Sequence, residues 1–132
     1  RIVRDALYGE GKRVASDRDP AYTVFMDPPL GRVGLTEQAA RDKNLDIKVA
    51  VLPAAAIPRA RLMGETTGML KAVDAKTGTI LGCALHCADA GEMINVVETA
   101  IRAGKDYTFL RDMIYTHPSM TEALNDLLSK IK

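Results

Sequence analysis

Residues 115–122, Tyr-Thr-His-Pro-Ser-Met-Thr-Glu, place one of the two histidines of the chain five positions before a glutamate. An imidazole that shares one ring nitrogen with a carboxylate keeps a single tautomer, and its other nitrogen is then free to act as a base. A glutamate one turn into the helix that follows Pro118 is within reach of the ring of His117. The spacing therefore allows His117 and Glu122 to form a catalytic acid/base pair.

The same stretch has a second interpretation that involves no catalysis. Ser119 and Glu122 form a Ser-x-x-Glu capping box before an apolar helix, in which the glutamate bonds the backbone N–H of the serine. Pro118 also suits a helix boundary, because the residue before a proline avoids the helical conformation. The residue types leave both roles of Glu122 open, and the position of its carboxylate distinguishes them.

Cys83, His86 and Cys87 are a second group of residues with possible chemistry. On a helix, this spacing would suit a metal ion. On a strand, the two cysteines lie about 13 Å apart, beyond the ~7 Å Cα separation of a disulfide. Because residues 78–87 are predicted as a strand, we expect two buried, unbonded cysteines and no metal. A metal site made of these three residues is the alternative.

The elements that must position these residues are predicted as strands first and helices afterwards. Strands are expected at 21–26, 46–53, 66–74 and 78–87, and the last two form a hairpin. Residues 27–34 are predicted as a turn region, and residues 54–65 as irregular structure or a short strand.

Helices are predicted from capping residues and from apolar residues that recur at helical spacing. Thr36 is the expected N-cap of a helix that closes at Asn44, and Asp89 with Glu92 is the expected capping box of a helix that ends at Gly104. Two more helices are expected on either side of Pro118, with these apolar residues on their faces: Phe109, Leu110, Met113 and Ile114, then Ala123, Leu124, Leu127, Leu128 and Ile131. This order predicts an α+β fold with an antiparallel sheet packed against helices.

Composition narrows the class of protein. The 132 residues are 47% hydrophobic and 27% charged, with a formal net charge of +1, which is ordinary for a globular domain. This balance gives no electrostatic case for nucleic acid or an anionic membrane, and no apolar run approaches the ~20 residues of a membrane span. Because two cysteines are too few for a disulfide scaffold and no signal peptide is recognisable, we expect a cytoplasmic protein.

The first twenty residues predict the end of a preceding unit. Residues 2–7 have helical spacing that stops at Gly9 and Gly11, and a polar stretch follows to Pro20. The chain does not begin with Met, and we expect it to be a piece of a longer protein. The domain proper is predicted as 21–132. It lacks the glycine loops of dinucleotide and phosphate sites and the H-E-x-x-H motif, so that any cofactor site must be completed by other residues.

Three segments in order resemble the C-terminal dimerisation domain of the pyridine nucleotide-disulfide oxidoreductases, the relatives of glutathione reductase, lipoamide dehydrogenase and mercuric reductase. These segments are VGLTEQAA, GMLKAVDAKTGTILGCALHCADAGEMI and HPSMTEAL, and the resemblance extends from about Tyr22 to Leu128. Four segments resemble the reactive-chlorine-resistance branch in particular, namely RIVRDALYGEGKR, FMDPPLGRVG, LPAAAIPRARLM and THPSMTEALNDL. The chain lacks the C-terminal vicinal cysteines of mercuric reductases, which weighs against mercury as a substrate.

The resemblance implies that this is the interface domain of an FAD-dependent, NAD(P)H-using homodimer. It implies that His117 and Glu122 are an acid/base pair supplied to the flavin and redox-active cysteines of the partner subunit, and that His117 and Pro118 lie against that flavin. Residues 1–20 would then be the tail of the last helix of the FAD domain and a linker.

The same resemblance implies that the redox-active cysteine pair lies outside this chain, so that Cys83 and Cys87 are not that pair. Besides the partner copy, the expected partners are the FAD and NAD(P) domains of the parent chain. The fragment alone is expected to hold no cofactor and to be inactive. The alternative function is a stand-alone dimerisation or metal-binding module.

Overall fold

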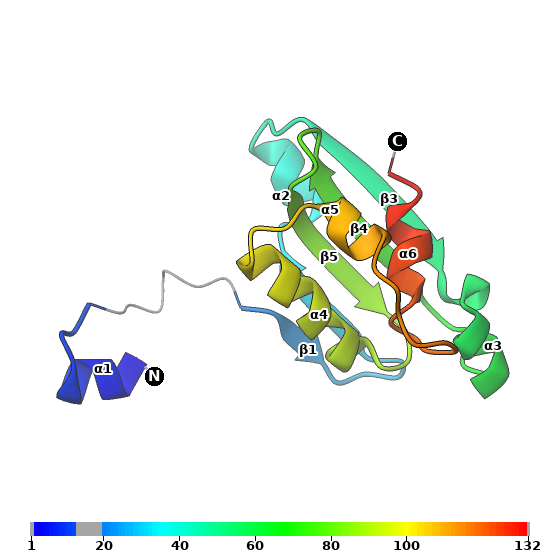
Figure 1. The fold of residues 1–132 in the computed structure, drawn as a ribbon, viewed down its shortest axis with the longest axis horizontal. Helices are drawn as coiled ribbons and strands as arrows, with labels where there is room; N and C mark the ends of the chain where they lie inside the picture. Colours follow the sequence, from blue (N-terminus) through cyan, green and yellow to red (C-terminus); the bar gives the residue numbers. More distant parts are fainter. Residues whose placement is uncertain (1, 13–19, 132) are drawn as a thin grey trace.

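The fold is built on one antiparallel sheet with the strand order β1-β2-β5-β4-β3 (Figure 1). The computed structural model describes residues 2–12 and 20–131. The strands of the sheet are β1 (Tyr22–Val24), β2 (Leu30–Gly34), β3 (Ile47–Pro53), β4 (Met69–Ala75) and β5 (Ile80–His86). The predicted hairpin is present as β4 and β5, which pair directly.

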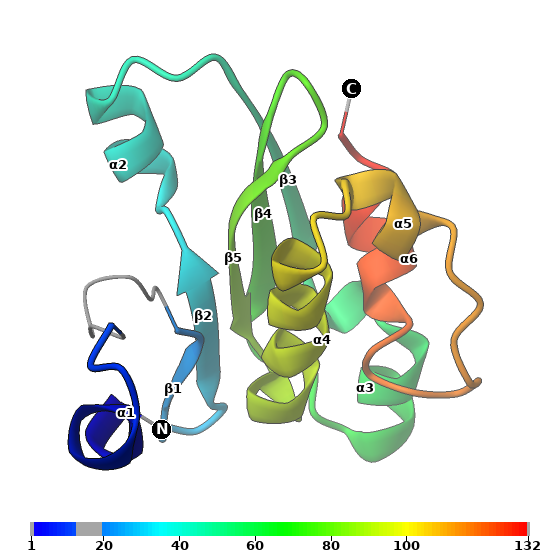
Figure 2. The same ribbon diagram turned by 60° about the vertical axis from the view of Figure 1, so that its left-hand side comes forward.

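Helices from the C-terminal part of the chain cover one face of this sheet. The helical elements are α1 (Ile2–Tyr8), α2 (Glu37–Asp42), the 3-10 turn η2 (Ala54–Ala56), α3 (Pro58–Met63), α4 (Ala90–Arg102), α5 (Tyr107–Arg111) and α6 (Ala123–Leu128). α4 packs on β2 and β5, and α6 packs on β3 and β4, with α5 beside α6 (Figure 2). The predicted α+β class, with an antiparallel sheet packed against helices, is confirmed.

The N-terminal segment stands apart from this body. α1 contributes no buried residue and lies away from the sheet (Figure 1). Most of the predicted linker, residues 13–19, lies outside the described residues. Within the two described stretches, 2–12 and 20–131, no helix has both the length and the apolar character needed to cross a bilayer.

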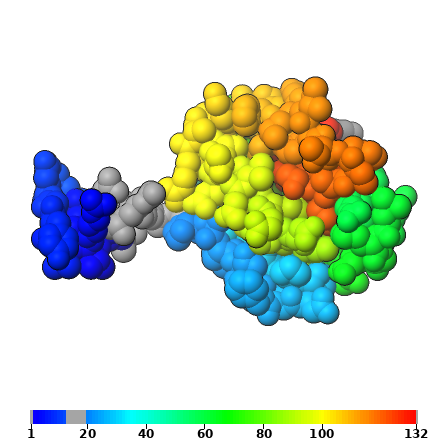
Figure 3. All heavy atoms as spheres, turned by 60° about the horizontal axis from the view of Figure 1, so that its bottom comes forward, coloured from blue at the N-terminus to red at the C-terminus, as the bar shows by residue number. Residues whose placement is uncertain are grey.

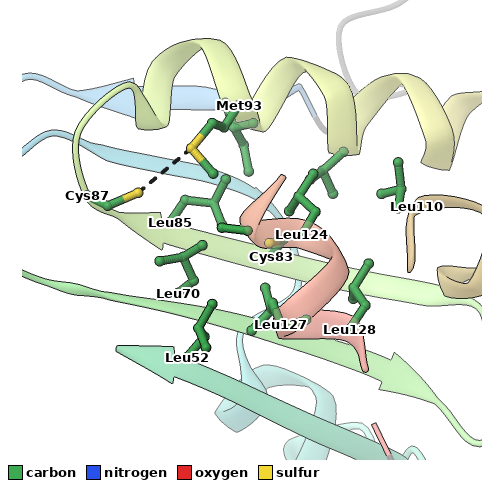
Figure 4. Close-up of a cluster of buried hydrophobic side chains, with 14 of the residues drawn as sticks. Leu52, Leu70, Cys83, Leu85, Cys87, Met93, Leu110, Leu124, Leu127 and Leu128 are labelled. Carbon is green, nitrogen blue, oxygen red and sulfur yellow. Dashed lines mark hydrogen bonds between the residues drawn. The ribbon is translucent and has the colours of Figure 1, made fainter. Parts of the chain in front are cut away.

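The hydrophobic core fills the space between the sheet and helices α4 and α6 (Figure 4). Alternate residues of the central strands point into it, as the period of two requires. They meet Met93 of α4 and three leucines of α6, namely Leu124, Leu127 and Leu128. Burial of such side chains contributes about 1.5–3 kcal/mol each, so α6 is held firmly on the sheet. This anchoring matters because α6 begins directly after Glu122.

An ionisable side chain is buried within the sheet. Asp74 of β4 is 0% exposed, and neither of its carboxylate oxygens has a hydrogen-bond partner. Removal from water disfavours the ionised form, and burial accordingly raises the pKa of Asp74 to about 7. The protein interior therefore contains a group whose charge state changes near neutral pH.

The start of α2 follows the sequence prediction. Thr36 has extended backbone angles, and its side-chain oxygen accepts a hydrogen bond from the backbone N–H of Ala39 at 2.9 Å. This is the geometry of an N-cap residue, which satisfies one of the free N–H groups of the first helical turn. The predicted cap is confirmed.

Thr36→Ala is expected to lower the free energy of unfolding by about 1 kcal/mol, because the N–H of Ala39 loses its acceptor. Urea unfolding followed by circular dichroism measures this change. Thr36→Ser keeps a hydroxyl and serves as the matched control. An equal loss in the two variants would show that the hydroxyl does not stabilise the helix.

Two segments differ from their predictions. Residues 27–34 were expected to form a turn, yet Leu30–Gly34 is β2, because its glycines hide the strand alternation. Gly31 is needed there, since a Cβ atom would lie 2.5 Å from the carbonyl oxygen of Ala90 at the start of α4. Residues 54–65 were expected to be irregular or a strand. They form η2 and α3. Pro58 is the first residue of α3, and Gly64, which has the left-handed conformation, caps its C-terminal end.

The predicted capping box at Asp89 is also wrong. α4 begins at Ala90, but Asp89 has a φ of 58° and its side chain makes no capping hydrogen bond. An N-cap side chain reaches the first turn only from extended backbone angles, and the left-handed conformation of Asp89 does not supply them. The helix itself is present, and its buried residues are Ala90, Met93, Ile94, Val97 and Ala100.

Candidate functional site

His117 and Glu122 lie in direct contact. The Nδ1 atom of His117 is 3.0 Å from Oε1 and 3.0 Å from Oε2 of Glu122. The two side chains differ in exposure, with 73% for the histidine and 15% for the glutamate. The carboxylate is therefore held in the protein, while the imidazole that it binds projects into solvent.

This contact decides what each nitrogen of the ring can do. An ionised carboxylate only accepts hydrogen bonds, so the proton of the neutral ring is on Nδ1 of His117, and this N–H donates a hydrogen bond to Glu122. The second nitrogen, Nε2, then has a free lone pair and can accept a proton. The pair thus has the arrangement of a general base and its orienting group.

The competing capping role of Glu122 is only half present. The Oγ atom of Ser119 accepts from the backbone N–H of Glu122 at 3.3 Å, which is the serine half of a capping box. The glutamate makes no side-chain capping bond at the start of α6. Ser119 thus stabilises the helix start, and the carboxylate of Glu122 is left for the ring.

The segment that leads to His117 is not the continuous helix predicted from the sequence. α5 starts after Asp106, whose carboxylate accepts from the N–H groups of Thr108 and Phe109, and it ends at Arg111. The predicted apolar face is broken up, since Ile114 is 96% exposed and only Leu110 of α5 is buried. Pro118 therefore does not end this helix.

Side chains from outside α5 satisfy the carbonyl groups at its C-terminal end. The Nδ2 atom of Asn125 in α6 lies 2.7 Å from the carbonyl oxygen of Arg111 and 2.9 Å from that of Met113. The hydroxyl of Tyr115 donates to the carbonyl of Leu110 at 3.0 Å. Burial raises the pKa of Tyr115 to about 12, so this hydroxyl keeps its proton. These bonds explain why the chain can leave the helix so early.

An open hollow of about 470 Å³ lies beside His117. Its lining combines exposed apolar side chains with polar groups, and consists of Arg111, Met113, Ile114, Tyr115, His117, Glu122, Asn125 and Asp126. The segment that follows α5, orange in the space-filling view, lies on the outer surface (Figure 3). The imidazole is thus placed where another molecule or subunit can reach it.

Cys83 and Cys87 are free thiols, and both are buried. Cys83 lies on β5 as expected, whereas Cys87 follows the end of the strand and contacts the Sδ atom of Met93 at 3.9 Å (Figure 4). Burial raises the pKa of the Cys83 thiol and raises that of Cys87 to about 12. Throughout the described part of the chain, no three His, Cys, Asp or Glu residues are grouped as metal ligands. His86 therefore has no place in such a site there.

Sequence reasoning identified His117 and Glu122 but missed Asn125 and Tyr115. Asn125 follows Glu122 by three positions, which places the two on neighbouring positions of one helix face. That spacing was a usable signal. The carbonyl groups that the Asn125 amide bonds could not be predicted from the sequence, because they depend on how α5 and α6 pack.

Known proteins of similar sequence were found along the whole chain. The profile of the family described as "Pyridine nucleotide-disulphide oxidoreductase, dimerisation domain" matches residues 20–128. The probable pyridine nucleotide-disulfide oxidoreductase RclA of Escherichia coli (strain K12) is 58% identical over 100% of this chain and 30% of its own length. A mercuric reductase of Bacillus cereus is 38% identical over 92% of this chain and 19% of its own length.

Solved structures agree with these matches. The HOCl-induced flavoprotein disulfide reductase RclA from Escherichia coli superposes with a TM-score of 0.93 at 57% identity, covering 100% of this chain and 31% of that one. LpdA from Mycobacterium tuberculosis has the same fold, with a TM-score of 0.84 at 22% identity over 98% of this chain and 28% of its own. The chain thus spans about a third of the length of these proteins or less. It belongs to the pyridine nucleotide-disulfide oxidoreductase family, of which it is a dimerisation domain.

Proposed function

We propose that this chain is the interface domain of an FAD-dependent, NAD(P)H-using disulfide reductase, and that it supplies His117 and Glu122 to the flavin and dithiol site of the partner subunit. The observation that carries the proposal is the contact between Nδ1 of His117 and both oxygens of Glu122, with the ring exposed. The similarity to a flavoprotein disulfide reductase over the whole chain supports the same assignment.

In this function His117 moves a proton. When a disulfide is reduced, one sulfur becomes the reactive thiolate, and the other must exchange a proton with a nearby base. Nε2 of His117 accepts the proton from the thiol and later returns it to the reduced product. Glu122 keeps the ring in the required tautomer and stabilises the imidazolium that forms. Bound FAD supplies the electrons that it receives from NAD(P)H.

The exposed surface around His117 fits a cofactor completed by another subunit. The ring of His117 and the neighbouring Ile114 are both largely exposed, which leaves an imidazole and an apolar side chain for a flavin edge to cover. His117 and Pro118 are the residues of this chain that would lie against it. Residues 1–20 are the tail of the FAD domain and its linker, and the FAD and NAD(P) domains belong to the same parent chain.

The proposed assembly is a homodimer in the cytoplasm. Two free, buried cysteines suit a reducing compartment. The isolated chain is inactive in this scheme, because it contains neither the flavin domain nor the redox cysteines. The final electron acceptor is an oxidised thiol, a metal ion or another oxidant.

Complementation between two inactive subunits tests whether His117 acts across the dimer. One full-length variant carries His117→Ala, and the other carries a serine in place of a cysteine of the redox pair. After dissociation and reassociation, about half of the dimers are mixed, and each mixed dimer has one intact site. Turnover is therefore expected to return to roughly a quarter of the wild-type value.

The matched control mixes His117→Ala with Glu122→Ala, since both sites of that mixed dimer keep a defect. Native mass spectrometry verifies that mixed dimers have formed. Mixed dimers without recovered turnover would show that the pair does not serve the partner subunit.

A further inference from the structure

We infer that Asn125 is a positioning residue, which holds the segment 112–117 so that the ring of His117 is presented in one place. The inference rests on the proposed function, because it concerns the same acid/base pair. It is carried by hydrogen bonds from one side-chain amide in α6 to two carbonyl groups on either side of the point where α5 ends.

The hydrogen-bond donors of this cluster match its acceptors. The amide of Asn125 has two N–H donors, and its two shortest contacts are to the carbonyl oxygens of Arg111 at 2.7 Å and Met113 at 2.9 Å. The carbonyl of Leu110 lies 3.3 Å from the same nitrogen and is better served by the hydroxyl of Tyr115 at 3.0 Å. Each donor therefore has a carbonyl of its own.

These bonds matter because little else fixes the segment. The last carbonyl groups of a helix have no partner within the helix, so that those of α5 need hydrogen-bond donors from elsewhere. Met113, Ile114, Thr116 and His117 are all exposed, and their side chains add no core packing. The half-buried Tyr115 is the one side chain between Asp112 and His117 that packs against the core. Backbone bonds to α6 are thus the main restraint.

The same helix face holds the ring and the segment. Glu122 binds the imidazole from the N-terminal end of α6, and Asn125, three positions later, binds the backbone that leads to it. α6 is itself fixed by buried Leu124 and Leu127. A change at Asn125 therefore alters the backbone position of His117 while the carboxylate of Glu122 remains in place.

The test uses the full-length protein with Asn125→Ala and Asn125→Asp. Alanine removes both donors, and aspartate replaces them with acceptors that repel the carbonyl groups. Amide hydrogen exchange in peptides covering 112–118 is expected to accelerate about tenfold, and thiol-linked turnover to fall about tenfold, with the larger effect for aspartate. Reduction of bound FAD by NAD(P)H is expected to stay unchanged.

Ser129→Ala is the matched control. Its hydroxyl bonds the carbonyl of Asn125 within α6 at 2.7 Å, so the variant loses a bond of the same helix without touching the segment. Asn125→Ala is also combined with His117→Ala. If Asn125 acts by positioning the ring, the added substitution is expected to cause no further loss of turnover.

Two results would overturn the role of Asn125 and leave the proposed function standing. One is unchanged hydrogen exchange at 112–118 in Asn125→Ala. The other is that Asn125→Ala lowers turnover by the same factor with and without His117→Ala. A His117→Ala variant with full turnover would instead overturn the proposed function, and with it the reaction that Asn125 serves. The exchange measurement separates the two failures, because it does not depend on turnover.

Discussion

His117→Ala is expected to slow thiol-linked turnover of the full-length protein by about 10²-fold or more, the usual scale for a lost acid/base group. The free nitrogen of the ring is the one atom of the pair that can exchange a proton with a thiol, since Nδ1 is bound to Glu122. Alanine removes it and leaves the helix cap at Ser119 intact. FAD binding and reduction by NAD(P)H are expected to survive, because those steps do not need this proton.

Stopped-flow absorbance separates flavin reduction from the later thiol-linked step in this variant. Glu122→Gln is a useful companion, because it keeps the size of the side chain while its amide can present an N–H to Nδ1 and favour the wrong tautomer. Its turnover is expected to lie between those of wild type and His117→Ala. Full turnover of a folded, dimeric His117→Ala protein would leave residues 115–128 as a helix junction without a catalytic role.

Asp74→Asn is expected to raise the free energy of unfolding at alkaline pH by several kcal/mol and to change it little near pH 4. Burial raises the pKa of Asp74 to about 7, against about 3.9 for an aspartate in an unfolded chain. Between these values the folded protein binds a proton that the unfolded chain releases, so stability falls as pH rises from about 4 to about 7. A pKa difference of about three corresponds to about 4 kcal/mol.

Asparagine is neutral at every pH and nearly the same size as aspartate, so the substitution removes only the pH dependence of stability that arises from Asp74. Urea unfolding of the wild-type and variant chains at several pH values between 4 and 8 gives the difference in stability. Other titrating groups are common to both proteins and cancel in that difference. If the free energies of unfolding of the two proteins differ by the same amount at every pH in this range, ionisation of Asp74 does not destabilise the folded state.

The sequence predicted those parts of the fold that have local signals. The hairpin of β4 and β5 follows from alternation and a turn, and the N-cap Thr36 follows from its position before an apolar helix. Predictions failed where distant contacts decide. β2 depends on the approach of α4 to Gly31, and the end of α5 depends on Asn125, fourteen positions from Arg111.

In the candidate site, too, local features could be predicted and features that depend on distant contacts could not. His117 and Glu122 are five positions apart, and local geometry was enough to expect their contact. Whether the carboxylate bound the ring or capped the helix was left open by the residue types, and the structure places it on the ring. The hollow beside His117 was beyond prediction, because it forms only when α5 and α6 lie side by side.

The two buried cysteines have a consequence for how electrons can travel. Both cysteines are buried, and burial raises the pKa of both thiols and so keeps them in the thiol form. Because the thiolate is the reactive form, neither Cys83 nor Cys87 is a ready nucleophile for exchange with a disulfide. Neither cysteine therefore gives electrons a second route through this domain.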